Sequence, residues 1–318
     1  MRNNMRIVFM GTPDFSVPAL EKLVQAGHEV AAVVTQPDKP KGRGKAVLMT
    51  PVKKKALEFN IPVYQPAKVR ETAFIEVLKE IGPEAIVVVA FGQILPKAIL
   101  ELPKYGCVNI HASLLPKYRG AAPIQWVIID GEKETGVTTM YMNEGLDTGD
   151  MLERVVVPIE KKETGGSLHD KLSAAGGELI LSTLDKLKTG ELQGTPQTDE
   201  GTCYAKMLHK SLGDINWNAS AASIERLIRG LNPWPSAYTS LGGKTVKLWA
   251  ADVIEKEYGV TPGTICEVTK DSMVIQTGNG ALSVKELQLE GKKRMDIQAF
   301  LRGYPAEAGT MLERRIAE

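Results

Sequence analysis

The segment Glu84–Ala90 contains the run Ile-Val-Val-Val and is apolar almost throughout, and this constrains the fold more than any other part of the sequence. A strand with one face in water alternates apolar and polar residues, whereas a parallel strand buried on both faces does not. The run is therefore predicted to be a buried strand of a parallel sheet. Parallel strands need crossover connections, usually helices, so strands and helices should alternate along the chain.

The first part of the chain has this alternation. Apolar residues at helical spacing from Val17 to Val24 predict a helix that Gly27 closes. Further helices are predicted near Pro123–Asp130 and from an N-cap at Ser167 to Gly190. The other predicted strands are Arg6–Met10, Val30–Thr35, Gly106–His111, Thr138–Met142 and Leu152–Val157. Together these elements predict an α/β fold with a Rossmann-like, open, mostly parallel sheet and helices on both faces.

The sequence pattern changes after a polar, turn-rich stretch at Gly190–Tyr204. One helix is predicted near Ala219–Arg229, and the rest consists of short β-branched runs between glycines, which favours a small OB-like β-barrel. These runs are Thr245–Ala250, Gly263–Val268, Ser272–Gln276 and Ala281–Leu289. With 318 residues the chain is expected to have two domains. We predict a catalytic domain at 1–190, a linker at 191–207 and a C-terminal barrel at 208–318.

Cysteine usage and hydropathy exclude several classes of protein. Cys107, Cys203 and Cys266 are far apart and form no CxxC pair, so neither a disulfide framework nor a zinc site is expected. The N-terminus has no signal-peptide pattern, and no apolar segment approaches the roughly 20 residues that span a bilayer. A cytoplasmic protein without a membrane partner is expected.

The net charge of the chain says little about its partners, but the distribution of charge along the sequence says more. The net charge of +1 neither favours nor excludes a nucleic-acid partner. Residues 36–55, however, carry seven Lys or Arg against one acid, Asp38. On charge alone a solvated loop is the better interpretation of this stretch.

Asn109 and His111 lie two residues apart at the end of the predicted strand Gly106–His111. Ligands of open α/β sheets bind beyond the carboxyl ends of the strands, and alternation along a strand places both side chains on the same side. An amide donor beside an imidazole suits a reaction that develops negative charge on a carbonyl oxygen. On this short pattern alone, the alternative that both side chains only satisfy loop backbone groups is favoured.

Two neighbouring motifs strengthen the catalytic interpretation. Apolar residues in the loop Ser113–Pro123 could pack internally or line a site for a flat heterocycle. Asp147 lies in the glycine-flanked turn Gly145–Asp150. A lone acid in a turn usually bonds its own backbone, but beside His111 it would orient the imidazole and favour its protonated form.

These motifs together resemble a known family. Asn109-x-His111-x-Ser-Leu-Leu-Pro116-x-Tyr-Arg-Gly120, with Asp147 in Gly-Leu-Asp-Thr-Gly-Asp150, is similar to the 10-formyltetrahydrofolate-dependent formyltransferases. More narrowly, Gly11–Phe15, Gln36–Gly44 and Asn232–Pro235 resemble the branch of this family that acts on methionyl-tRNA. The resemblance extends over nearly the whole chain.

The resemblance implies transfer of the formyl group of 10-formyltetrahydrofolate, a reduced folate, to the α-amine of methionyl initiator tRNA for translation initiation. Asn109 and protonated His111 would bind the formyl oxygen and the resulting oxyanion, and Asp147 would pair with His111 and help to remove the amine proton through water. The implied folate-binding residues are Ser113, Leu114, Leu115, Pro116, Phe91, Gln93 and Leu95. The implied tRNA-binding residues are Phe15, Gly42, Arg43 and Lys45. Neither a metal nor NAD is expected, and the enzyme is expected to be a monomer.

Three alternatives are distinguishable. A related formyltransferase could act on a sugar-nucleotide amine or a purine precursor, but the basic stretch after Thr35 and a C-terminal domain favour tRNA, because a small acceptor needs neither. A nicotinamide oxidoreductase is disfavoured because the first βα turn reads Gly11-Thr-Pro-Asp-Phe-Ser16 rather than GxGxxG. A non-catalytic RNA-binding protein would leave Asn109, His111 and Asp147 without a role.

Overall fold

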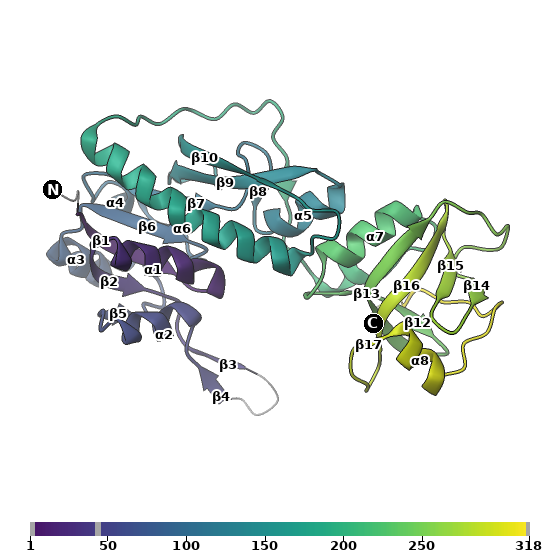
Figure 1. Cartoon of the computed structure of the whole chain (residues 1–318). Coiled ribbons are helices and arrows are strands. Elements are labelled where there is room, and N and C mark those ends of the chain that lie inside the picture. Colours follow the sequence, from purple (N-terminus) through teal and green to yellow (C-terminus); the bar gives the residue numbers. More distant parts are fainter. Residues whose placement is uncertain (1–3, 42–45, 316–318) are drawn as a thin grey trace. The chain divides into compact units, whose positions relative to one another are not determined.

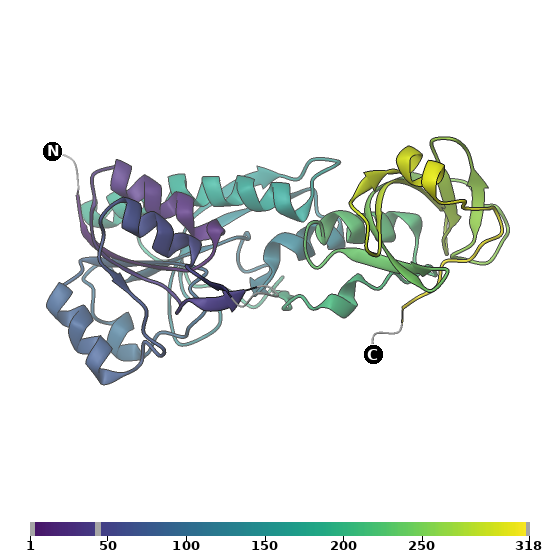
Figure 2. The same cartoon turned by 90° about the horizontal axis from the view of Figure 1, so that it is seen from below.

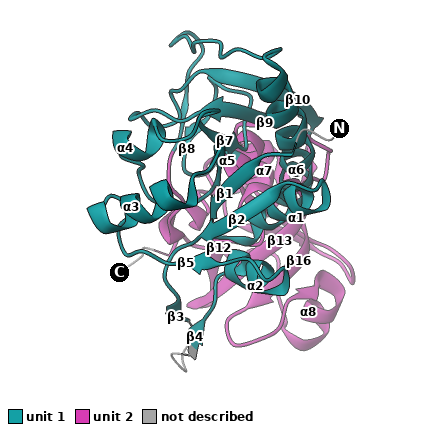
Figure 3. Ribbon diagram, turned by 90° about the vertical axis from the view of Figure 1, so that its left-hand side faces the viewer, with its two compact units in different colours: residues 1–123, 134–158, 169–205 teal, residues 124–133, 159–168, 206–318 magenta. Residues whose placement is uncertain are grey.

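The chain divides into two units by its internal contacts (Figure 3). The computed structural model describes residues 4–41 and 46–315. Unit 1 contains residues 1–123, 134–158 and 169–205, and unit 2 contains residues 124–133, 159–168 and 206–318. Within the described ranges, no helix has both the length and the apolar character needed to cross a bilayer.

This division differs from the predicted domains in one respect. The boundary between the units follows Ala205 and lies inside the predicted linker 191–207. The difference is that residues 124–133 and 159–168, which lie in the predicted catalytic domain, group with the C-terminal part. Hydrogen bonds explain the grouping: Arg226 Nε donates to the carbonyl of Ile129 at 3.0 Å, and Arg229 donates to the carbonyl of Glu163 at 2.9 Å.

Unit 1 is built on a seven-stranded sheet in the order β10-β9-β7-β6-β1-β2-β5 (Figure 1). The strands from β7 to β5 pair in parallel, whereas β9 and β10 continue the sheet antiparallel. Their bounds are β1 Arg6–Gly11, β2 Glu29–Val34, β5 Val63–Tyr64, β6 Ala85–Val89, β7 Cys107–His111, β9 Glu134–Tyr141 and β10 Met151–Pro158. All five residues of β6 are buried between β1 and β7, as the apolar run predicts. The mostly parallel sheet is confirmed.

Helices cover both faces of this sheet (Figure 2). The side chains of α3 and α4 pack with one set of strand residues in a single core cluster, and α1 and α6 lie over the opposite face. The helices of this unit are α1 Val17–Gln25, α2 Pro51–Glu58, α3 Thr72–Ile81, α4 Lys97–Leu100 and all but the start of α6 Gly165–Thr189, with a short 3-10 helix η1 at Asp14–Ser16. Gly176 lets α6 approach β7, because a Cβ there would lie 2.8 Å from a methyl carbon of Ile110.

The start of α6 corrects one prediction. Ser167 is not the N-cap, because the helix begins at Gly165. Instead the Ser167 amide donates to Thr164 Oγ1 at 3.1 Å, and the Thr164 amide donates to Ser167 Oγ at 3.0 Å. This reciprocal pair is a capping box with Thr164 in the cap position.

The basic stretch 36–55 is not simply a loop. Strands β3 (Lys39–Lys41) and β4 (Ala46–Leu48) pair as a hairpin, and α2 follows with Thr50 as its N-cap. Two of its lysines are neutralised: Lys53 pairs with Asp38 at 2.5 Å and Lys55 with Glu21 at 2.9 Å. The predicted tRNA-binding residues Gly42, Arg43 and Lys45 lie outside the described residues.

Unit 2 is an antiparallel β structure with helix α5 (Pro123–Asp130), all but the first residue of which lies in this unit, and with two further helices in its C-terminal part. Its sheet runs β12-β13-β16-β15-β14, and β17 pairs with β16. The strands are β12 Ala237–Leu241, β13 Lys244–Ile254, β14 Ile265–Val268, β15 Met273–Gln276, β16 Ala281–Leu289 and β17 Met295–Asp296. Helix α7 (Ala221–Gly230) packs on β13, and α8 (Ile297–Gly303) has Asp296 as its N-cap. A 3-10 helix, η2, spans Lys210–Gly213.

The segment 309–313 closes this sheet into a barrel. The Ser240 amide of β12 donates to the Glu313 carbonyl at 2.8 Å, and the Glu313 amide donates back at 3.0 Å. On the other edge, the Leu312 amide donates to Gly263 and the Ile265 amide donates to Thr310, both at 2.8 Å. The predicted barrel therefore closes through a C-terminal segment that carries no strand pattern of its own.

We predict that Leu312 anchors this closure. Its side chain is 2% exposed in the barrel core, so Leu312→Ala should lower the free energy of unfolding by about 2–5 kcal/mol. The neighbouring Met311 is 45% exposed, and Met311→Ala should change stability by less than about 0.5 kcal/mol. Urea denaturation of both variants measures the difference. Equal effects would show that the segment does not belong to the core.

Candidate active site

Asn109 and His111 project from the carboxyl end of β7. Asn109 lies between Val88 of β6 and Met140 of β9 in the sheet register, and His111 lies opposite Thr138. Alternation along the strand puts both side chains on one side. Among the described residues, the half-buried Asn109 amide has no hydrogen-bond partner, so its N–H groups are available to a ligand.

The imidazole of His111 is fixed by the backbone. Its side chain is 7% exposed, and Nε2 lies 2.9 Å from the carbonyl oxygen of Tyr118. A carbonyl can only accept, so Nε2 must carry a proton and donate it. In the neutral ring Nδ1 then bears the lone pair, and Nδ1 faces Asp147 Oδ2 at 3.7 Å. That distance is beyond a hydrogen bond, but it places the carboxylate beside the ring nitrogen that bears the lone pair.

Asp147 is held from a second direction. Its Oδ2 accepts the Gly120 amide at 2.8 Å, and its side chain is 15% exposed. Its backbone has a φ of +53°, a left-handed conformation that aspartate tolerates better than most residues. The predicted triplet is thus brought together by three segments: β7, the strand β8 at Arg119–Gly120, and the turn after β9.

The backbone of the Asp147 turn leaves no room for a side chain at Gly149. A Cβ there would lie 1.7 Å from the carbonyl oxygen of Tyr141, and because that oxygen is a backbone atom, a change of side-chain rotamer could not remove the clash. Asn143 Oδ1 accepts from the Gly145 amide and from the Thr148 hydroxyl, both at 3.0 Å. The motif therefore encodes the shape of the turn around the carboxylate.

The loop 113–116 after β7 is tied down by short hydrogen bonds. The Ser113 hydroxyl donates to the Lys117 carbonyl at 2.6 Å, and the Thr138 hydroxyl donates to the Ser113 carbonyl at 2.7 Å. Leu115 is fully buried, whereas Leu114 and Pro116 are half-buried. Among these predicted folate-binding residues, only Leu114 and Pro116 present part of their side chains to solvent.

The loop 90–95 after β6 also turns its predicted residues inward. Phe91 and Leu95 are 2% and 1% exposed and belong to the core beneath the sheet. The Gln93 amide is occupied, since its Oε1 accepts the Val69 amide at 2.9 Å. The large apolar side chain of this loop that points outward is that of Ile94, which is 82% exposed and which the sequence patterns did not single out.

Phe15, a predicted tRNA-binding residue, is packed within unit 1. It is 8% exposed, and its ring meets the ring of His169 edge-on at a centroid distance of 5.3 Å. Its carbonyl accepts the Ser173 hydroxyl at 2.7 Å. In this conformation the phenyl ring stabilises the contact between η1 and α6.

Cys107, the first residue of β7, is not an alternative nucleophile. Burial raises the pKa of the Cys107 thiol to about 12, so it is protonated at neutral pH. Across the described ranges, no group of three or more His, Cys, Asp or Glu side chains could hold a metal ion.

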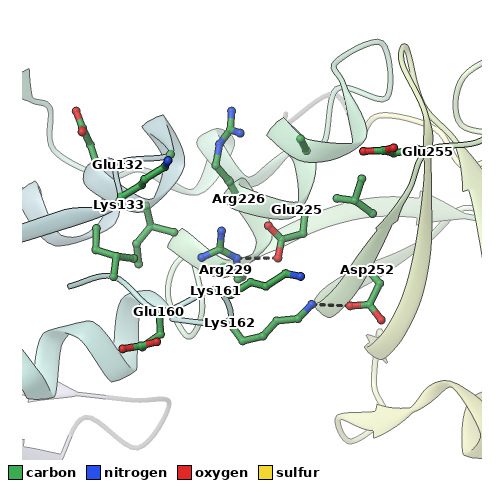
Figure 4. Close-up of a pocket in the computed structure, with 15 residues that line it drawn as sticks. Glu132, Lys133, Glu160, Lys161, Lys162, Glu225, Arg226, Arg229, Asp252 and Glu255 are labelled. Carbon is green, nitrogen blue, oxygen red and sulfur yellow. Dashed lines mark hydrogen bonds and ion pairs between the residues drawn. The ribbon is translucent and has the colours of Figure 1, made fainter.

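A cavity of about 890 Å³ lies in unit 2 and contains none of the triplet (Figure 4). Its lining has five cationic and five acidic side chains. Several of them pair, as Lys162 does with Asp252 at 2.5 Å and Arg229 with Glu225 at 2.7 Å. Balanced charge of this kind selects neither an anion nor a cation, so the cavity gives no reason to move the active site away from β7.

Both units match models of one family. Residues 5–184 match the model of formyl transferase, and residues 207–305 match that of the formyl transferase C-terminal domain. The chain is 58% identical over 306 residues to the methionyl-tRNA formyltransferase of Agathobacter rectalis, covering 96% of this chain and 99% of that one. It is 51% identical over 308 residues to the methionyl-tRNA formyltransferase of Clostridioides difficile, covering 97% of this chain and 100% of that one.

Solved structures share the fold at low sequence identity. WlaRD, a sugar 3N-formyl transferase, superposes with a TM-score of 0.66 at 20% identity, over 91% of this chain and 99% of that one. HypX from Aquifex aeolicus, crystallised with tetrahydrofolic acid, has a TM-score of 0.64 at 19% identity, over 98% of this chain and 51% of that one. With the two family models and the full-length relatives, these findings establish that the chain belongs to the formyl transferase family, on the branch of the methionyl-tRNA formyltransferases.

Proposed function

We propose that this chain is a cytoplasmic, monomeric enzyme that transfers the formyl group of 10-formyltetrahydrofolate to the α-amine of methionyl initiator tRNA. The observation that carries the proposal is the arrangement of Asn109, His111 and Asp147 at one edge of the unit 1 sheet. The full-length relatives named as methionyl-tRNA formyltransferases support the choice of donor and acceptor.

In the first step, the lone pair of the acceptor amine attacks the formyl carbon, and the carbonyl oxygen becomes an oxyanion. The amide of Asn109 and the Nδ1–H of protonated His111 donate to that oxygen. Preorganised donors of this kind contribute most to catalysis where charge develops. His111 Nε2 remains bonded to Tyr118, so Nδ1 is the ring nitrogen left for the reaction.

In the second step, the bond between the formyl carbon and folate N10 breaks, and its electron pair goes to N10. The amine loses a proton through water to Asp147, and N10 takes up a proton, so tetrahydrofolate and the formylated amine leave without net change in charge. Neither a metal nor a nicotinamide takes part. The Asp147 carboxylate lies 3.7 Å from His111 Nδ1, close enough to interact electrostatically with the ring while the oxyanion exists.

We propose that folate lies against the loops 113–116 and 90–95. Leu114 and Pro116 would contact it through partly exposed side chains, whereas Ser113, Leu115, Phe91, Gln93 and Leu95 would shape the site through their backbone and their packing. Ile94 is added to this set because it is the most exposed large apolar side chain of the two loops.

A sugar amine is the second candidate acceptor. It is favoured by one observation, the fold shared with WlaRD, but that likeness at 20% identity extends to the fold alone. Formyl transfer from labelled 10-formyltetrahydrofolate to methionyl initiator tRNA, to methionyl elongator tRNA and to an amino sugar nucleotide would decide between them. Preference for the initiator tRNA supports the proposal, and turnover of the sugar alone would replace it.

Asn109→Ala and His111→Ala should each lower kcat by about 10²–10³-fold or more, because each removes a donor to the oxyanion. Folate affinity, measured by the quenching of intrinsic fluorescence, should change little, because these donors act mainly in the transition state. Single-turnover transfer measures kcat, and urea denaturation confirms folding. Near-normal turnover in either variant would remove that residue from the mechanism.

Asp147→Asn should keep the fold but lower kcat by about 10²–10⁴-fold. Its amide oxygen can still accept the Gly120 amide, while the negative charge beside His111 is lost. Asp170→Asn, a matched change at an exposed residue of α6, should leave kcat unchanged. Equal activity of the two variants would show that the charge of Asp147 is not needed.

The variant Arg43→Ala tests whether methionyl-tRNA is the acceptor of the formyl group. Arg43 lies in the basic stretch that the resemblance assigns to tRNA, so the change should lower kcat/KM for methionyl-tRNA sharply while folate binding stays intact. Loss of one phosphate contact should also reduce the slope of log affinity against log salt by about 0.7–0.9. The control is Lys54→Ala, because Lys54 is exposed on α2 in the same stretch. Unchanged values for Arg43→Ala would count against tRNA as the acceptor.

A further inference from the structure

We infer that Gln197 is a positioning residue of the active site, which holds the turn that carries Asp147. The segment 191–207 was predicted to be a linker, yet part of it is built into unit 1. Residues 204–205 form β11, which pairs in parallel with β8, and Thr195 bridges to Met151 of β10. The inference rests on the proposed function, because it gives Gln197 a role in formyl transfer.

All three polar groups of the Gln197 side chain are engaged. Its Nε2 donates to the carbonyl of Asp147 at 2.8 Å and to the carbonyl of Gly149 at 2.7 Å. Its Oε1 accepts from Arg119 Nε at 2.9 Å. One side chain therefore connects the left-handed backbone of Asp147 to an arginine on β8.

Arg119 completes this arrangement. It is 3% exposed, and besides Gln197 it donates to the Thr198 carbonyl at 3.4 Å and pairs with Asp199 at 3.3 Å. The next residue, Gly120, donates its amide to the Asp147 carboxylate. The Gly120 amide thus holds Asp147 by its carboxylate, and the Gln197 side chain, itself bonded to Arg119, holds it by its backbone carbonyl.

The left-handed backbone of Asp147 needs this support. A non-glycine residue at positive φ is strained and persists when its surroundings determine it. If the turn relaxed, the carboxylate would move away from His111 Nδ1, where it lies at 3.7 Å. A shift of about 1 Å at a catalytic group can cost up to about 10²-fold in rate.

The variant Gln197→Glu distinguishes a role of Gln197 in positioning the Asp147 turn from a role in packing alone. The carboxylate has the same shape and can still accept from Arg119, now as an ion pair, so the link between the segment and β8 is kept. Both donors to the turn are lost, and carboxylate oxygen then faces the carbonyls of Asp147 and Gly149. We expect kcat for formyl transfer to fall about 10- to 100-fold, with little change in KM for folate and an unchanged urea midpoint.

Thr198→Ala is the matched control. Thr198 is exposed, and among the described contacts it joins this network through its backbone carbonyl. Its kcat should equal that of the wild type. Wild-type kcat in Gln197→Glu would overturn the inference, as would an equal fall in kcat and in the urea midpoint, which would indicate loss of structure.

A double-mutant cycle tests whether Gln197 acts through Asp147. In the Asp147→Asn background the turn is unchanged but the catalytic charge is absent, so adding Gln197→Glu should cost less than about 3-fold in single-turnover rate. The same 10- to 100-fold loss in both backgrounds would assign Gln197 a role independent of Asp147. If the wild type transferred no formyl group at all, the proposed function would fail instead, so the two failures are distinguishable.

Discussion

The hydrogen bond from the Gly120 amide to the Asp147 carboxylate is the interaction on which the active site depends. Its donor lies in β8, and the same short stretch supplies the Tyr118 carbonyl that fixes His111 Nε2 at 2.9 Å. One stretch of backbone therefore sets the positions of both the imidazole and the carboxylate. Gly120 has a φ of +111°, and a Cβ there would lie 2.8 Å from the Ala205 carbonyl, so glycine is required where β8 pairs with β11.

The parts of the fold that follow from hydrophobic periodicity were predictable from the sequence. The apolar run of β6 predicts a buried parallel strand, and Asn109 and His111 at the end of β7 predict a site at the carboxyl edge. Several elements were not predicted, among them α3, although its apolar residues recur at helical spacing. Two others have weak local patterns: β12 follows a proline-rich turn, and 309–313 becomes an edge of the barrel only through tertiary hydrogen bonds.

The contacts that hold the catalytic side chains were missed for a related physical reason. Tyr118 and Gly120 act through their backbone carbonyl and amide, and every residue type has these groups, so the sequence does not reveal which position supplies them. Gln197 lies in a polar, turn-rich stretch that is typical of a linker, and its partners are about 50 residues away in sequence, so only the folded chain shows the connection. For the predicted folate-binding residues the sequence motif is specific, but it does not show which way the side chains point, and several of them point into the core.

The central claim is that His111 is held with its proton on Nε2 and with Nδ1 turned toward Asp147. Nitrogen-15 NMR of the histidine side chains, with His111 assigned by its absence in His111→Ala, measures the tautomer directly. We predict that neutral His111 carries its proton on Nε2, because the Tyr118 carbonyl can only accept. A proton on Nδ1 in the neutral ring would contradict the account, since the lone pair would then face a carbonyl and Nδ1 would not be the nitrogen that gains a proton for catalysis.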